Sequence, residues 1–225
     1  MKALALIAAI HAALRFGGLW MPALVPLSMM VIWPMPWVGG YFRSRRAAAG
    51  FRRCQPTWVV AGIGYGAAAA AACAAVAWTV HGVTDLNWFH RHALALGEAA
   101  AGMPPGLSVM ATFWFVTIPA MIFSPTAEEI LFRGYLQRAV TERRGASRAI
   151  VVQAAAFAVI HLAHYGLRPW QPGLIPVWLL SMFCVGWLLG WIRHRSDSLW
   201  PAMAAHAAFN LVMNAVAMWM FGVGL

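Results

Sequence analysis

Six apolar stretches dominate the sequence, and each is close to the ~20 residues that a helix needs to cross a bilayer. They cover residues 18–42, 57–80, 107–124, 149–165, 174–192 and 200–222. Charged residues make up only 10% of the chain, against about 25% in soluble domains. No long polar linker separates the stretches. The sequence therefore predicts one all-α membrane domain over residues 1–225, with lipid covering much of its surface.

A further apolar run, residues 3–14, is shorter than the others. It follows Lys2 and ends at Arg15, and a run of about 12 residues is too short to span a bilayer. We therefore expect a helix that lies at the interface or is only partly inserted. With this run included, the predicted transmembrane bundle has six to seven spans.

Arginine-rich segments alternate with the apolar stretches. They lie at 43–53, 138–148 and 193–195, whereas the loops at 81–106 and 166–173 carry few arginines. Arginine-rich loops stay on the cytoplasmic side of a membrane. The pattern therefore predicts a multi-pass integral membrane protein, and it explains the net charge of +10 without a nucleic-acid partner. The histidines of the loop 81–106 are expected to face solvent; they are His81, His90 and His92.

The alanine-rich run from Ala67 to Ala75 lies within the stretch 57–80. Small side chains let two membrane helices approach each other closely. The run therefore predicts a face against which another helix packs, in preference to a low-complexity segment.

Residues 107–143 are too many for one spanning helix, since 1.5 Å per residue gives a length of roughly 55 Å. Pro119 and Pro125 can break or kink a helix. The sequence Ser124-Pro125-Thr126 combines a capping side chain with a proline in the first turn, which is typical of a helix start. We therefore predict that a second helix begins near Thr126, after a break at membrane depth.

Glu128 and Glu129 open this predicted second helix, beside an apolar span where carboxylates are costly and usually functional. Thr126 and Glu129 fit a capping box. Glu129 and Arg133 are four residues apart, so they can form a salt bridge on one helix face. We assign Glu129 and Arg133 a supporting structural role. Glu128 lies about 100° round the helix and is the candidate base.

Two further polar elements lie on later apolar stretches. The first is His161; the second is the pair His206 and Asn210, which share a helix face because they are four residues apart. Hydrogen bonding between helices also explains each of them, and Asn214 extends the second face in favour of that interpretation. His164 is nearer the end of its span and is expected at the interface.

Four side chains are predicted to lie at a similar depth: Glu128, His161, His206 and Asn210. Counting 1.5 Å per residue from the arginine-rich loops puts them roughly 10–20 Å into the membrane, where they can meet in one cavity. Peptide hydrolysis needs a base for water and donors for the oxyanion. Glu128 and His161 can activate water, while His206 and Asn210 can donate to the oxyanion. One glutamate and two histidines are also a plausible zinc set, so Glu128, His161 and His206 form an alternative metal site, although we expect no cofactor.

The chain carries EExxxR at 128–133, FxxxH at 157–161 and HxxxN at 206–210. In this order on successive helices, the three motifs resemble the CAAX-protease and bacteriocin-processing family of intramembrane glutamic proteases. The resemblance covers residues 107–215, the expected protease core, and leaves the N-terminal spans in residues 1–100 without an assigned role. It implies a helical bundle with a catalytic cavity inside the membrane, and the same roles for the site residues.

The resemblance also implies an endopeptidase that cuts a membrane protein or peptide near its C-terminus or membrane anchor. Prenylated CAAX proteins are the eukaryotic substrates, and bacterial members are linked to peptide maturation, immunity and the processing of C-terminal sorting tails. An alanine-rich composition with more arginine than lysine favours a bacterial inner-membrane protein. The alternatives are a proton-coupled transporter, since intramembrane Glu and His also build proton relays, and a non-catalytic membrane binding or immunity protein.

Overall fold

The computed structural model describes residues 2–104 and 106–221, and within these ranges the regular elements are all helices. In chain order they are α1 (Lys2–Gly17), α2 (Leu24–Ile32), α3 (Gly40–Ala49), α4 (Pro56–His81), α5 (Trp88–Ala101), α6 (Val109–Glu129), the π-helix η1 (Ile130–Leu136), α7 (Gln137–Arg144), α8 (Ala146–Ile160), the 3₁₀-helix η2 (His161–Ala163), α9 (Ile175–Ser196) and α10 (Leu199–Phe221). The predicted all-α bundle is confirmed.

Five helical segments in the described part of the chain are long and apolar enough to cross a membrane. They are α4, the continuous segment Val109–Arg144, the segment Ala146–Ala163, α9, and residues Leu199–Trp219 of α10. These segments correspond to the predicted spans from residue 57 onwards. The chain is therefore an integral membrane protein in its architecture, with fewer spanning helices than the six to seven predicted.

The first predicted span, residues 18–42, is wrong. This segment forms α2, which has only nine residues, followed by turns and the start of α3. Pro34 and Pro36 follow directly after α2, and a proline lacks the N–H group that the next helical turn needs. High hydropathy alone therefore overestimated the length of this helix.

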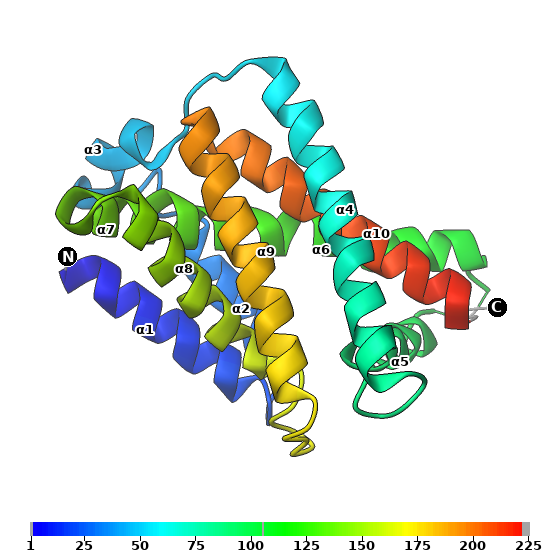
Figure 1. Ribbon diagram of the computed structural model, residues 1–225. Helices are drawn as coiled ribbons and strands as arrows, with labels where there is room; N and C mark the ends of the chain where they lie inside the picture. The colour runs from blue at the N-terminus through cyan, green and yellow to red at the C-terminus, as the bar shows by residue number, and fades with distance from the viewer. Residues whose placement is uncertain (1, 105, 222–225) are drawn as a thin grey trace.

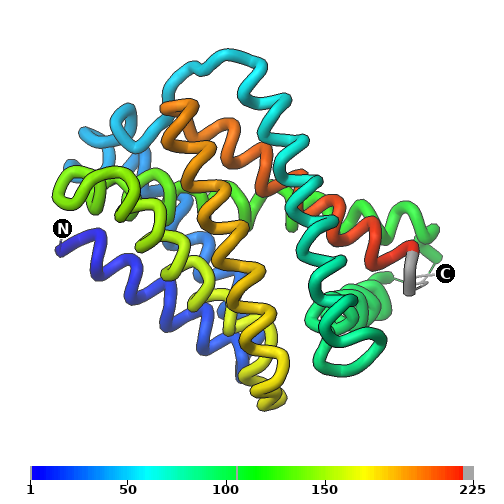
Figure 2. Tube along the Cα trace, viewed as in Figure 1, coloured from blue at the N-terminus to red at the C-terminus, as the bar shows by residue number. Residues whose placement is uncertain are grey.

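The N-terminal helix α1 lies along the bundle and does not stand apart from it. It packs against α2 and also contacts α8 and η1. The trace in Figure 2 shows α1, in dark blue, running beside the yellow-green α8. The C-terminal end of α1 therefore lies close to the candidate site residues of the later helices.

The most extensive contact between two helices joins α4 and α10, which cross each other in Figure 1. A Cβ atom on Gly66 would overlap the backbone carbonyl oxygen of Ala205, and one on Gly62 would lie 2.5 Å from that of Pro201. Further along the same face of α4, Ala70 is fully buried. The predicted packing face is confirmed, and it extends one further turn to the glycines that precede the alanine-rich run.

Substitution of Gly66 by leucine is expected to destabilise the protein by about 1–3 kcal/mol, because the side chain must push two helix backbones apart. Gly64 is the matched control, since nothing lies within 4 Å of a Cβ atom at that position. Thermal unfolding of the purified proteins in detergent measures the difference. Equal midpoints for Gly66→Leu and Gly64→Leu would contradict the close crossing.

Residues Val109–Arg144 form one continuous helix that changes from α to π and back to α. α6 runs through Pro119 and Pro125 without interruption. The predicted break near Thr126 is therefore wrong, and Ser124-Pro125-Thr126 is not a helix start. The π-helix η1 follows directly, and π segments are frequent at functional sites.

Two side chains from other elements bond to the backbone of α6 close to its prolines. The Nδ2 atom of Asn210 donates to the carbonyl oxygen of Ala120 at 2.8 Å. The Nε1 atom of Trp33 donates to the carbonyl oxygen of Phe123 at 3.2 Å. Both bonds tie α6 to neighbouring elements beside its prolines, although they do not reach the carbonyl oxygens of Phe115 and Met121, which lose their donors to the two prolines.

Candidate active site

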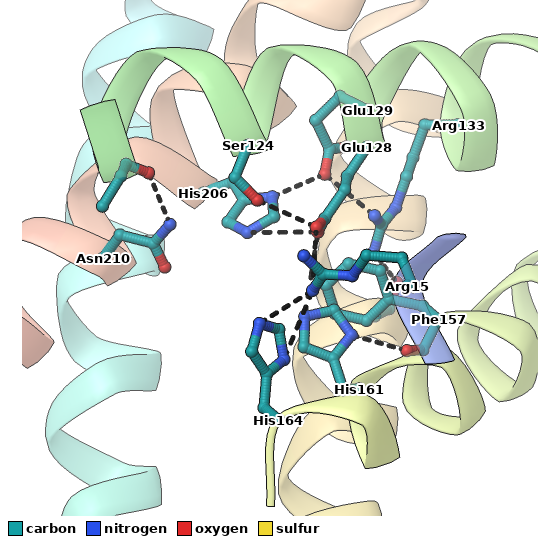
Figure 3. A network of polar contacts seen from close by, with 12 residues as sticks. Arg15, Ser124, Glu128, Glu129, Arg133, Phe157, His161, His164, His206 and Asn210 are labelled. Carbon is teal, nitrogen blue, oxygen red and sulfur yellow. Dashed lines mark hydrogen bonds and ion pairs between the residues drawn. The ribbon is translucent and has the colours of Figure 1, made fainter. Parts of the chain in front are cut away.

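A cavity of about 400 Å³ opens between α1, α5, α6, α9, α10 and the end of α8. All four predicted site residues line it: Glu128, His161, His206 and Asn210. They come from three separate helical segments. Figure 3 shows His161 and His206 beside the carboxylate of Glu128, whereas Asn210 lies apart from it. The rest of the lining is largely aromatic and aliphatic, so the polar groups stand in apolar surroundings.

The carboxylate of Glu128 is the centre of the cavity's polar network. Its side chain is 1% exposed, and its Oε1 atom accepts a hydrogen bond from Ser124 Oγ at 2.9 Å. Its Oε2 atom has no hydrogen-bond partner. The Nε2 atoms of His161 and His206 lie 3.7 and 3.9 Å from Oε2. These distances are too long for direct hydrogen bonds.

Both imidazole rings are oriented by a bond from their other nitrogen. The Nδ1 atom of His161 lies 2.7 Å from the carbonyl oxygen of Phe157, and Nδ1 of His206 lies 2.9 Å from Glu129 Oε1. Both partners are acceptors, so each Nδ1 carries a proton and a neutral ring has a lone pair on Nε2. Both lone pairs then face Glu128 Oε2.

Glu129 and Arg133 form a fully buried ion pair, with Arg133 Nη1 2.8 Å from Glu129 Oε1. The predicted salt bridge is confirmed. The guanidinium also donates to the carbonyl oxygen of Gly186 at 3.2 Å and lies over the Phe157 ring, 4.3 Å from its centroid. The predicted capping role of Glu129 is wrong, because α6 does not begin at Thr126. Glu129 instead holds the ring of His206, a contact that the sequence did not indicate.

Substitution of Arg133 by alanine is expected to reduce the amount of folded protein more than the turnover of each folded molecule. It leaves the buried Glu129 carboxylate without its partner, which typically costs about 3–5 kcal/mol. Arg148, which is exposed on α8, gives the matched control Arg148→Ala. Quantitative immunoblotting of membranes, with turnover expressed per folded molecule, separates the two effects. Normal abundance with abolished turnover would show that Arg133 acts in the chemistry.

Arg15 is a site residue that the sequence did not reveal. Its side chain is 3% exposed, and its Nη2 atom lies 3.8 Å from Glu128 Oε1 and 2.7 Å from His164 Nε2. Its Nε atom has no partner. In the sequence, Arg15 only follows an apolar run that is too short to span a bilayer. An arginine in that position is also typical of the end of an interfacial helix.

His164 also lines the cavity, where its Nε2 atom lies 2.7 Å from Arg15 Nη2. His92 also lines the cavity. Its ring bonds Tyr165 Oη at 3.1 Å and Asn214 Oδ1 at 2.9 Å. The expectation that His92 faces solvent is therefore wrong. The turn after η2 and the start of α5 together form this side of the cavity.

A zinc ion would need Glu128, His161 and His206 as ligands. Among the residues that the structure describes, no group of three or more His, Cys, Asp or Glu side chains is arranged to hold a metal ion. The donors' chemistry is suitable, since each ring has its Nε2 lone pair free, but their placement does not fit a metal site. We therefore derive no step through a metal.

These features define a class of protein: a helical membrane protein with a buried glutamate between two histidines. Residues 110–212 match the family model described as Rce1-like, the type II CAAX prenyl endopeptidase Rce1-like family. The match confirms the predicted resemblance: residues 110–212, the segment that carries all four candidate site residues, are similar to this protease family. The comparisons with curated proteins and with solved structures find no match.

Proposed function

We propose that the protein is an intramembrane endopeptidase that uses Glu128 and His161 to activate water. One observation carries this proposal: the unpartnered Oε2 atom of Glu128 faces two imidazole nitrogens across gaps that are too long for direct bonds. A water molecule in such a gap can donate to Glu128 and His161 together. The match to a protease family supports the same reaction class.

In the proposed reaction, water attacks the carbonyl carbon of the substrate while Glu128 takes one of its protons. The carbonyl oxygen becomes an oxyanion that needs hydrogen-bond donors. Glu128 then passes its proton to the leaving nitrogen, the C–N bond breaks, and the second proton of the water moves from the new carboxylic acid to the amine, so that a carboxylate and an ammonium group are released. The cavity's apolar lining keeps bulk water away from these charged intermediates.

The candidate oxyanion donors differ in what they can supply. His206 can donate from Nε2 only as an imidazolium, because its Nδ1 proton is bonded to Glu129. Asn210 already uses one N–H for Ala120 and has a second one free. Arg15 is always charged, and its Nε atom has no partner. We therefore add Arg15 to His206 and Asn210 as an oxyanion donor.

The geometry also balances the charges of the site. Arg133 pairs with Glu129 at 2.8 Å, whereas Arg15 stays 3.8 Å from Glu128. With both histidines neutral, two carboxylates meet two guanidiniums and the site has no net charge. The short contact between Arg133 and Glu129 suits a structural role. Arg15 and Glu128 are further apart, and this separation leaves room for a substrate carbonyl beside Glu128, which suits catalysis.

The proposed substrate is a protein or peptide in the lipid bilayer, cut near its C-terminus or membrane anchor. The cavity of about 400 Å³ is lined mainly by apolar groups, which fits an apolar peptide segment that enters from the membrane. We further propose a bacterial inner membrane, with the arginine-rich segments in the cytoplasm. A C-terminal tail or a maturing peptide is then a better candidate substrate than a prenylated CAAX protein.

The test compares protein termini in membranes of cells that lack this gene, complemented with the wild type or with Glu128→Gln. New termini that appear only with the wild type would establish a protease and identify its substrate. Identical termini, with both proteins present at equal levels, would refute the proposed reaction. Such a result would instead support a binding or immunity protein that shares the family's fold.

A further inference from the structure

A second cavity, of about 270 Å³, is lined by Arg133 but not by Glu128. It is bounded by the end of α3 and the segment after it, by η1 and α7, and by the end of α9. Its charged lining residues are Arg52, Arg133, Arg138, Arg193, Glu142 and Asp197. The proposed protease reaction uses none of this space.

The carboxylates of this cavity are outnumbered by the guanidiniums that contact them. Glu142 contacts Arg138 and a second arginine from α3. Asp197 contacts both Arg52 and Arg193. Each carboxylate is thus shared by two arginines. In the cavity lining Arg133 is already paired with Glu129, so the other three arginines face two carboxylates and one positive charge is left without a partner. An anion bound in the cavity would balance it.

Buried polar atoms in the lining also lack partners. The Nε atoms of Arg133 and Arg138 make no hydrogen bond, and neither does Oε1 of Gln137. Arg133 is 1% exposed and Gln137 is 4% exposed, so bulk solvent does not reach them easily. A buried donor without a partner costs roughly 1–3 kcal/mol. The cavity lining thus includes buried polar side chains whose hydrogen-bonding capacity is not fully used.

We infer that this cavity binds a phosphate-bearing anion. Guanidinium groups bind phosphate by paired, charge-assisted hydrogen bonds, and the cavity's excess of positive charge favours an anion. A phosphate that keeps one proton can also donate to Gln137 Oε1. The anion can be the headgroup of an anionic phospholipid or free inorganic phosphate, because the recognised chemistry is the same.

Arg133 connects this cavity with the candidate active site. Arg133 lines this cavity while its Nη1 atom holds Glu129, which in turn holds His206. A bound anion would tie α7 and the end of α9 together around Arg133. The inference concerns binding alone, so it stands whether or not the chain is a protease.

The test is thermal unfolding of the purified full-length protein in a neutral detergent, with phosphate or with chloride at the same ionic strength. Phosphate is expected to raise the midpoint by about 3 °C or more for the wild type. The shift should disappear in Arg138→Gln and in Arg52→Gln. It should remain in Arg143→Gln, which removes an exposed arginine of α7 that does not line the cavity. The two cavity variants keep the test valid if one of them fails to fold.

A second arm replaces phosphate by lipid, with phosphatidylglycerol added to phosphatidylcholine nanodiscs. A shift that depends on Arg138 in this arm would identify a headgroup as a ligand, whereas a shift with phosphate alone would identify the free anion. Either result supports the site. An equal shift in all variants, or none with either probe, would overturn the inference.

Discussion

Glutamine at position 128 is expected to lower turnover by roughly 10²- to 10⁴-fold, the usual contribution of a positioned general base. The amide has nearly the same shape as the carboxylate, so Ser124 can still bond to it and the helix need not move. It cannot take a proton from water. Turnover is measured on the substrate that the comparison of termini identifies, with the enzyme in native membranes and its amount normalised.

The matched control for this variant is Glu98→Gln. Glu98 is an exposed glutamate on α5 that does not line the catalytic cavity, so the same chemical change there should leave turnover intact. Glu128→Asp is informative as a third variant, because it keeps the carboxylate but withdraws it from the two histidines. Full activity of Glu128→Gln would rule out Glu128 as the base.

Arg15→Gln is expected to reduce kcat by roughly 10²- to 10³-fold with a smaller change in KM, as loss of an oxyanion donor does. Glutamine can still donate a hydrogen bond, but it lacks the charge that opposes the developing oxyanion. Arg15→Lys restores the charge without the planar fork, so we expect an intermediate rate. A steady-state assay on the identified substrate gives kcat and KM separately.

Arg168→Gln provides the matched control for the Arg15 variant. Arg168 is exposed, and its guanidinium lies over the Trp20 ring, outside the cavity. Loss of abundance in Arg15→Gln with normal turnover per molecule would mean that Arg15 only balances the charge of Glu128. If Glu128→Gln is inactive but Arg15→Gln is active, the result supports the proposed protease reaction and contradicts the proposed role of Arg15 as an oxyanion donor.

The sequence predicted that three side chains from the second half of the chain meet in the cavity. Glu128, His161 and His206 interrupt apolar helices where a polar group is costly, and counting residues from the arginine-rich segments gave them a common depth. The i,i+4 pair of Glu129 and Arg133 also follows from helix geometry alone. These parts depend on local sequence and on regular helices, and the structure brings these residues together as predicted.

The parts that sequence reasoning missed depend on contacts between distant segments. Arg15 and His164 are 149 residues apart and meet only through the packing of α1. The bond from His206 to Glu129 likewise joins positions 77 residues apart. Pro125 is an ambiguous signal, because whether a membrane helix continues through proline depends on which neighbours bond to its carbonyls.

The contribution of α1 limits what the family segment can do by itself. Residues 110–212 hold Glu128, His161 and His206, but Arg15 and His92 come from outside that segment. A fragment or chimera built on the shared segment alone would therefore keep Glu128 without its counter-cation and lose one wall of the cavity. The same holds for protein design. A fusion at the N-terminus is attached to the helix that carries Arg15, so an affinity tag placed there can disturb the surroundings of Glu128 from outside the matched segment.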